Sequence, residues 1–464
     1  MTTVRSASTV LTNALTHYHE ELQHALSALE RDRAGSGEAF SPAFRLPEPS
    51  LALEQFFSVS DIGIAELAAY RGHSLRLLDL MRNPGTRTTK TLASLTIVAR
   101  AVRHITETGE RILIVTPSSA NKATALRDAV HRAIVAGLVT ADQLQITCVV
   151  PDVSTAKLWS SPLSEDALLR RRNPLVVHVS EEPASVKELA AAFTAEHAER
   201  LWRQYRVRVW YTLGLDNYRA ADMIRAFVER DLLPEADSDT GTRTHVHSVS
   251  SAFGLLGHDL GHRRVTESGG RTLPQARYFL VQHLGTPDMV LSLRHGTHDR
   301  GNLPAYRFEA SEGLYRQDGD PHFPATTFDP AEQLDPTFYT RRPVTSAHMD
   351  PLIARQGGGG LVVSLHECLS RYAEVRGLLA AAGVSLPADP RRLREWSLVM
   401  AVTGTLNAAD RGLLPDSEDV LIHASGSYGD QDYLPVPDHH RLSAADVTTL
   451  AGHVEDAVRA ATSH

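Results

Sequence analysis

Cysteine and long apolar runs are both scarce in this chain of 464 residues. Its two cysteines, Cys148 and Cys368, cannot build a disulfide framework and suit a reducing compartment, so we expect a cytoplasmic protein. No apolar run approaches the ~20 residues of a membrane-spanning helix, and residues 1–14 lack the apolar core of a signal peptide. These absences argue against a membrane partner and against a secreted disulfide scaffold.

The chain has fewer basic than acidic residues, and few of its basic residues are lysines. The formal net charge is −8, whereas nucleic-acid-binding proteins usually carry a basic excess, so we expect no nucleic-acid partner. Lysine is especially rare, and nearly all of the 47 basic residues are arginine. The four lysines are Lys90, Lys122, Lys157 and Lys187. Chemistry that requires a lysine amine therefore has four candidates.

Apolar residues, in contrast, make up 42% of the chain, which excludes global disorder and supplies a large core. From residue 75, short apolar runs alternate with helical periodicity, which is the pattern of a parallel sheet covered by helices on both faces. The predicted strands are 75–80, 111–115, 144–150, 175–179, 246–249, 361–365 and 420–422. The predicted helices are 8–32, 90–108, 123–136, 367–382 and a terminal one after 443. A linker is predicted at 34–50, a polar stretch covers 231–244, and long loops or an insertion are predicted at 291–350.

The first lysine, Lys90, follows a predicted turn and stands at the start of a predicted helix. Residues 83–89 read Asn-Pro-Gly-Thr-Arg-Thr-Thr, and Lys90 opens the predicted helix 90–108. A helix N-terminus carries free N–H groups and a partial positive field, which helps a lysine there toward its neutral, nucleophilic form. The alternative is a surface lysine on a capped helix, and this segment alone does not decide between the two.

Small hydroxylated residues follow the next strand. Ser118-Ser119-Ala120-Asn121 comes directly after strand 111–115 and opens a helix, where N–H and O–H donors can point at one anion. Serine and asparagine are also common helix caps, so capping is the alternative. The loop lies about one strand–helix–strand step after Lys90, a spacing that favours a shared ligand.

Six segments in this order resemble the fold-type II pyridoxal-phosphate (PLP) enzymes, and threonine synthase most of all. They are Leu77–Pro84 followed by Lys90, Ser118–Asn121, Leu215–Asp222, Val246–Gly257, Leu280–Pro287 and Ser425–Asp430. The resemblance spans roughly 75–435. The chain departs from the family in one extra residue before Lys90, in Thr91 where an aspartate is usual, and in Ala252 and Phe253 where small residues are usual.

This resemblance implies a role for each matched position. Lys90 would form the Schiff base with PLP and act as the base at the substrate Cα, while Asn121 would lie beside the cofactor's 3-hydroxyl. Ser425 would bond the pyridine nitrogen as a neutral hydroxyl, which suits elimination or replacement over transamination. The cofactor's phosphate is expected on Ser250, Ser251, Ala252, Phe253 and Gly254, and the substrate on Ser118, Ser119 and Thr89.

The resemblance also implies the architecture, an α/β fold of two three-layer α/β domains with the cofactor between them and an N-terminal helical extension. The expected parts are an N-terminal helix and linker at 1–50, a large PLP-binding domain at 51–110 and 211–440, a small domain at 111–210 and a C-terminal helix at 441–464. A homodimer is the oligomer that the family implies.

The function that follows is that of a PLP-dependent lyase or synthase. It would perform β- or γ-elimination or replacement on an amino acid with an activated side chain. Because the chain departs from housekeeping threonine synthase at several positions, we expect a specialised role in natural-product biosynthesis. Two alternatives stay open: a catalytically inactive relative that binds a ligand or partner, and a metal-dependent hydrolase.

Two further segments could form binding sites, a group of histidines for a metal and a run of glycines for a phosphate. His245, His247, His258 and His262 show metal-ligand spacing, but no carboxylate or cysteine stands at ligand spacing, so we expect no metal. Gly357–Gly360 is a second candidate for a phosphate cradle. It lacks the Lys-Ser/Thr pair of a nucleotide loop, and a tight turn before a buried strand is favoured.

Overall fold

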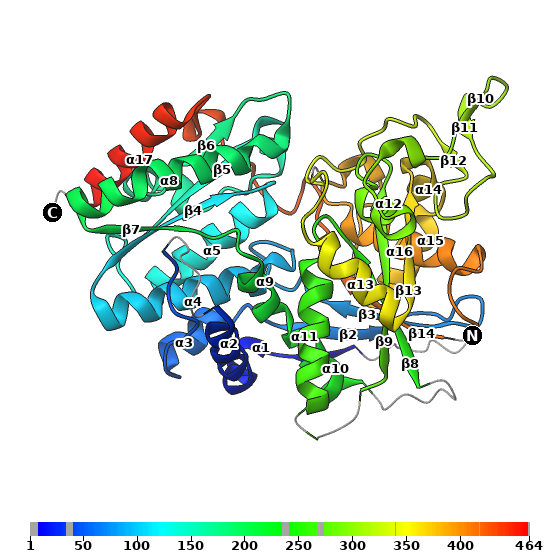
Figure 1. The fold of residues 1–464 in the computed structure, drawn as a ribbon, viewed down its shortest axis with the longest axis horizontal. Helices are drawn as coiled ribbons and strands as arrows, with labels where there is room; N and C mark the ends of the chain where they lie inside the picture. Colours follow the sequence, from blue (N-terminus) through cyan, green and yellow to red (C-terminus); the bar gives the residue numbers. More distant parts are fainter. Residues whose placement is uncertain are drawn as a thin grey trace. The chain divides into compact units, whose positions relative to one another are not determined.

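The computed structural model of this chain describes residues 8–33, 40–233, 241–267, 269, 273–338, 340–416 and 418–462, and Figure 1 labels its elements. The described residues form two compact units. Unit 1 takes those within Met1–Leu11, Asp61–Arg82 and Asp222–Asp432, and unit 2 takes those within Thr12–Ser60, Asn83–Ala221 and Tyr433–His464. Each unit is built around its own β-sheet. None of the described helices is long and apolar enough to cross a bilayer.

A seven-stranded sheet organises unit 1, in the order β1-β2-β3-β14-β8-β9-β13. The strands from β3 to β13 run parallel, while β1 and β2 add an antiparallel edge. The strands are β1 (Thr9–Leu11), β2 (Ile62–Glu66), β3 (Ser74–Asp79), β14 (Asp419–Ala424), β8 (Thr242–Ser248), β9 (Gln275–His283) and β13 (Gly358–Val363). Because β3, β14 and β8 are parallel neighbours, the loops that leave their carboxyl ends share one edge of the sheet.

The two faces of this sheet differ in chemistry because alternate residues of a strand point to opposite sides. Val246 and Ile422 join the apolar core together with helix α16. Their strand neighbours, His245 before Val246 and His423 after Ile422, point to the other face, where α10 and α11 lie. The helices of unit 1 are α10 (Ile224–Leu232), α11 (Phe253–Glu267), α12 (Asp288–His295), α13 (Ser346–Gln356), α14 (Leu365–Ser370), α15 (Tyr372–Ala381) and α16 (Ser397–Asp410).

Unit 2 contains a five-stranded sheet in the order β15-β6-β5-β4-β7, parallel throughout. Its strands are β15 (Leu442–Ser443), β6 (Leu175–His178), β5 (Leu144–Pro151), β4 (Arg111–Pro117) and β7 (Val207–Tyr211). Helix α17 lies beside α8, and α4 packs against α5 (Figure 1). The helices are α1 (Ala14–His17), α2 (His19–Arg33), α3 (Leu51–Phe57), α4 (Lys90–Thr108), α5 (Asn121–Val135), α6 (Pro162–Glu165), α7 (Ala167–Arg172), α8 (Val186–Tyr205), α9 (Leu215–Asp222) and α17 (Val447–Thr462).

Most of the predicted elements are present. Strands β3, β4, β5, β6, β8 and β14 lie where apolar runs predicted them, and α4 spans 90–108 as expected. Between α12 and α13 the described residues form mostly loops, with a small antiparallel sheet of β10 (Arg307–Glu309), β11 (Leu314–Arg316) and β12 (Thr326–Thr327). Of the linker predicted at 34–50, residues 34–39 lie outside the described residues.

The continuous helix predicted at 8–32 is wrong at its start. Thr9–Leu11 is a strand that pairs with Ile62–Ile64 of β2, so backbone pairing with a sheet edge overrides the helical spacing of the apolar side chains. Asn13, at φ 49°, then turns the chain into α1. The helix predicted at 367–382 is likewise divided in two, with Arg371 between α14 and α15.

The turn predicted at Gly357–Gly360 is also corrected, because Gly358 and Gly360 already belong to β13. Here glycine permits close approach to β9. A Cβ at Gly358 would lie 2.0 Å from the carbonyl oxygen of Tyr278, and one at Gly360 would lie 2.9 Å from the Cβ of Leu280. This segment is therefore a packed strand of the sheet.

The compact units divide the chain at other points than the expected domain boundaries. Residues 83–110, which include Lys90, belong to unit 2, because α4 buries most of its first four turns and packs against α5. The C-terminal helix α17 also belongs to unit 2, where it packs on α7 and α8.

Candidate functional site

Lys90 is the first residue of α4 and is half-buried. The loop before it is held by Asn83, whose Nδ2 donates to Asp128 Oδ2 on α5 at 3.0 Å and whose Oδ1 accepts from the Gly85 N–H at 2.9 Å. Thr86 Oγ1 lies 2.7 Å from Thr91 Oγ1 across the same turn. The Asn-Pro turn thus anchors the start of the lysine-bearing helix to its neighbour within unit 2.

Thr89 and the Ser118–Asn121 loop also lie in unit 2. Thr89 is buried and takes the helical backbone conformation just before α4. Ser118 Oγ accepts from the Ala123 N–H at 2.8 Å and from the Ala120 N–H at 3.2 Å. The Ser118 hydroxyl therefore caps α5, which is the alternative weighed for it, while Ser119 and Asn121 are half-buried beside it.

Ala120 has an unusual backbone. Its φ of 96° and ψ of −62° lie in a region that residues with a side chain rarely occupy. The strained conformation places Asn121 at the first position of α5. Such strain is often found where a loop must present its N–H groups to a ligand.

The segment Ser250–Gly254 lies in unit 1, where the loop after β8 enters the first turn of α11. Ser250 and Ser251 are half-buried, Ala252 has a left-handed φ of 49°, and α11 begins at Phe253. Gly254 lies directly on the guanidinium of Arg225, because a Cβ there would lie 2.6 Å from Nη2. A residue larger than glycine at this position has to displace a buried arginine.

Ser425 follows the last residue of β14, and β14 is the parallel neighbour of β8. The loops carrying Ser250–Gly254 and Ser425 therefore leave the same carboxyl edge of the unit 1 sheet, where ligands of open α/β sheets bind. The loop after Ser425 is fixed to the start of α16, since the Leu398 N–H donates to the Gly426 carbonyl at 3.0 Å. The structure thus brings the two predicted cofactor contacts of unit 1 to one edge.

A buried polar network beneath this edge was not anticipated from the sequence. Glu229 accepts from Arg243 Nη1 at 2.6 Å through Oε1, and its Oε2 lies 2.8 Å from His258 Nε2. His245 Nδ1 lies 3.0 Å from His423 Nε2, and Arg225 is paired with Asp222 at 2.6 Å. All seven side chains are buried.

The charge states in this network follow from burial and from the neighbouring charges. Burial lowers the pKa of His245, His258 and His423 below the ordinary value, so these imidazoles are neutral at pH 7. Burial alone would raise the pKa of Glu229, but the hydrogen bond from His258 and the charge of Arg243 lower it below its usual range, so Glu229 is a carboxylate.

One sequence signal points to this network. Arg243, His245 and His247 alternate along a buried strand, and a period of two places all three on one face. Arg225 and Glu229 are four residues apart on α10, and they face the same side of that helix. The pairing of β14 with β8, which adds His423, has no local signal.

The fold has solved counterparts. The chain is similar to the PLP-bound threonine synthase from Brucella melitensis, with a TM-score of 0.53 and 12% identity, over 94% of this chain and 89% of that chain. It is also similar to the threonine synthase from yeast, with a TM-score of 0.51 and 10% identity, over 87% of this chain and 81% of that chain. The two likenesses establish the fold, which is the fold-type II α/β architecture that the sequence motifs implied.

Sequence comparison gives one match, to a family model. No curated protein matches the chain. A family model matches residues 10–458, nearly the whole chain. The chain therefore belongs to the family described as a family of unknown function, DUF6002.

Proposed function

We propose that this protein is a PLP-dependent enzyme that performs β- or γ-elimination or replacement on an amino acid with an activated side chain. The observation that carries the proposal is the place of Lys90. It is the first residue of α4, after a hydrogen-bonded Asn-Pro turn, in a chain with the fold of the threonine synthases. Of the other lysines, Lys122 and Lys157 are buried and Lys187 lies within α8.

The residues present suit this cofactor. Lys90 supplies an amine, and Ser425 supplies a neutral hydroxyl for a ring nitrogen at the carboxyl edge of β14. The phosphate falls to Ser250, Ser251 and the backbone of Ala252–Gly254, at the N-terminus of a 15-residue helix. The left-handed φ of Ala252 turns neighbouring N–H groups in the way that anion-binding loops do. The bulky Phe253 leads us to expect weaker PLP retention than in typical relatives.

When bound, the cofactor withdraws electrons from the substrate Cα and so eases loss of a proton there. In the proposed reaction Lys90 takes and returns that proton. Ser119 and Thr89 bind the substrate carboxylate, and Asn121 donates to the cofactor's 3-hydroxyl. Ser118 contributes less directly, because its hydroxyl already accepts from two backbone N–H groups.

The lysine assignment is tested on the purified full-length protein. PLP bound through Lys90 gives a visible absorption band, and borohydride reduction with peptide mapping places the pyridoxyl group on Lys90. Lys90→Ala abolishes the band, whereas Lys187→Ala, a change at another half-buried lysine, leaves it intact. A pyridoxyl group on Lys122, Lys157 or Lys187 would overturn the assignment, and a folded, colourless protein would favour the inactive relative.

The role of the Ser118–Asn121 loop before α5 is tested by measuring both the stability and the activity of a variant. If Asn121 serves only as a helix-start residue, Asn121→Ala lowers stability by about 1 kcal/mol and leaves turnover per folded molecule unchanged. If it contacts the cofactor, the variant melts near the wild-type temperature and loses most of its activity. Ser251→Ala is the matching test for the phosphate, and an unchanged PLP affinity in that variant places the phosphate elsewhere.

The setting of the reaction is part of the same proposal. A specialised biosynthetic role follows from the departures at Thr91, Ala252 and Phe253, and we propose a homodimer in the cytoplasm. Both cysteines are buried and free, which is compatible with a reducing compartment. Sedimentation velocity of the purified chain measures the oligomer directly.

A further inference from the structure

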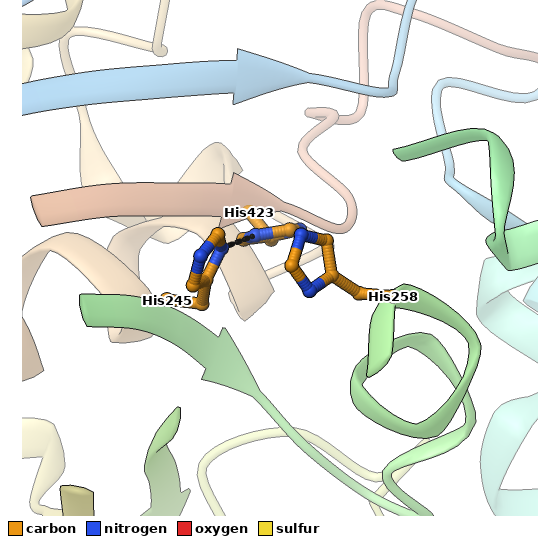
Figure 2. Close-up of side chains that lie close together, drawn as sticks. All are labelled: His245, His258 and His423. Atoms are coloured by element: carbon orange, nitrogen blue, oxygen red, sulfur yellow. Dashed lines mark hydrogen bonds between the residues drawn. The ribbon is translucent and has the colours of Figure 1, made fainter. Parts of the chain in front are cut away.

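Three histidines converge inside unit 1, beneath the edge that carries the proposed cofactor contacts. Figure 2 shows His245 on β8, His423 on β14 and His258 on α11, with their rings turned toward one another. One ligand nitrogen from each lies within 4.8 Å of the other two. All three side chains are at most 1% exposed, so the cluster is shielded from water.

The nitrogens are spaced for a shared ion. Zinc binds imidazole nitrogen at about 2.0–2.1 Å, so two ligands of a tetrahedral ion lie about 3.4 Å apart. His245 Nδ1 and His423 Nε2 are 3.0 Å apart, close to that separation. An imidazole binds a metal through its unprotonated ring nitrogen, so each of the three rings can offer one lone pair to a shared ion.

Glu229 orients two of the rings from behind. Its Oε2 lies 2.8 Å from His258 Nε2, and its Oε1 lies 3.8 Å from His245 Nε2, which has no hydrogen-bond partner among the described residues. With both Nε2 atoms carrying their protons toward one carboxylate, the Nδ1 atoms of both rings are left as lone-pair donors. A carboxylate behind a ligating imidazole is the usual outer arrangement of protein metal sites.

We propose that His245 and His258 through Nδ1, together with His423 through Nε2, bind a divalent transition metal ion, with Zn²⁺ as the first candidate. Imidazole ligands suit zinc and its neighbours rather than Mg²⁺ or Ca²⁺. Binding breaks three present contacts: the Tyr278 hydroxyl leaves His258 Nδ1, 2.9 Å away, the 3.0 Å hydrogen bond between His245 Nδ1 and His423 Nε2 opens, and the 3.4 Å contact from Arg225 to His423 Nδ1 is lost. Arg225 keeps its ion pair with Asp222.

The site has a structural consequence for unit 1. The three ligands come from β8, β14 and α11, the elements next to Ser250–Gly254 and Ser425. A bound ion ties these elements together, and so it fixes the two loops on which the proposed function places the cofactor. This consequence rests on the proposed function, whereas the metal site itself does not.

The site is tested with Zn²⁺ alone on full-length protein that is free of PLP. After treatment with a chelator, incubation with Zn²⁺ and desalting, the wild-type chain retains a single Zn²⁺ ion, measured by mass spectrometry of the metal. Co²⁺ in its place gives the visible spectrum of a nitrogen-bound tetrahedral ion. His423→Ala lowers Zn²⁺ affinity by more than about 100-fold, and Glu229→Gln lowers it by about 10–100-fold, the usual effect of an outer partner.

His247 and His262 provide matched controls. His247 is buried on the same sheet face and stacks on His423 with ring centroids 4.0 Å apart, while His262 lies one turn after His258 on α11. His247→Ala and His262→Ala retain the ion. If His423→Ala does not fold by circular dichroism, His423→Asn and the Co²⁺ spectrum of the wild type decide instead.

Three results would overturn the proposal: a wild-type chain that retains no Zn²⁺, folded triad variants that bind it as well as the wild type, or equal losses in the two controls. PLP affinity is then compared between zinc-loaded and zinc-free protein. A metal site without any PLP binding would refute the proposed function and leave this inference standing.

Discussion

Replacing Glu229 with glutamine tests how the buried network is held together. Glu229 is 1% exposed and is a carboxylate, because the hydrogen bond from His258 and the charge of Arg243 hold its pKa below the ordinary value despite burial. Arg243 is also 1% exposed, and its second partner is Asp419 at 2.8 Å. Glu229→Gln removes the charge that faces Arg243 but keeps the shape of the side chain.

The magnitude follows from these contacts. Breaking a buried ion pair by removing one partner costs about 3–5 kcal/mol, because the other charge stays buried without compensation. Arg243 retains Asp419, and the glutamine carbonyl can still accept a hydrogen bond, so we expect the lower end, about 3 kcal/mol. At a urea dependence of about 3 kcal/mol per molar, this is a decrease of about 1 M in the unfolding midpoint of unit 1.

The assay is urea unfolding of metal-free protein, followed by far-ultraviolet circular dichroism. The matched control is Glu199→Gln, which removes the same charge from a 2.6 Å pair with Arg203 whose two side chains are largely exposed. Water screens such a pair, so this variant unfolds like the wild type. A Glu229→Gln variant within about 0.5 kcal/mol of the wild type, the range of ordinary surface changes, refutes the assigned role of the carboxylate.

Three further outcomes are expected. Ala120→Gly raises stability by about 1 kcal/mol in a thermal melt, because a φ of 96° strains a residue with a side chain. Burial lowers the pKa of Lys122 to about 7, against about 10.4 when unfolded; the unfolded chain therefore binds more protons between these values, and wild-type stability rises with pH there. Lys122→Met raises the unfolding midpoint at pH 7 and abolishes that rise. Cys148 and Cys368 are buried, and burial raises both thiol pKa values, that of Cys148 to about 11, so a thiol reagent modifies them only after unfolding.

A different result would contradict each of these three predictions. A less stable Ala120→Gly variant would show that the methyl group contributes more through packing than its backbone strain costs. A Lys122→Met variant that retains the rise between pH 7 and 10 would assign that titration to another group. Rapid labelling of either cysteine in folded protein would contradict its burial.

Local features that depend on neighbouring residues in the chain were predictable. The start of α4 at Lys90 follows from the Asn-Pro turn and from the helical spacing of the apolar residues after it. The strands β4 and β5 follow from apolar runs that are buried on both faces. The family motifs, read in order, also implied the fold shared with the threonine synthases.

Other features needed the tertiary structure. Thr9–Leu11 has helical spacing, yet a free sheet edge at β2 captures it as a strand. Gly358 and Gly360 look like a turn, and only the close approach of β9 shows why glycine is needed in a strand. In both cases the deciding partner lies far away along the chain, beyond any local pattern.

The histidine cluster shows the same division most clearly. In the sequence, the spacing of His245, His247, His258 and His262 raised a metal site, but we expected no metal because no carboxylate or cysteine stands at ligand spacing. Only the order β14-β8 in the sheet brings His423 to His245, 178 positions away, and only the packing of α10 brings Glu229 to His258. Periodicity determines which way a side chain points, but strand order and helix packing decide what it meets, because they are set by burial over the whole unit.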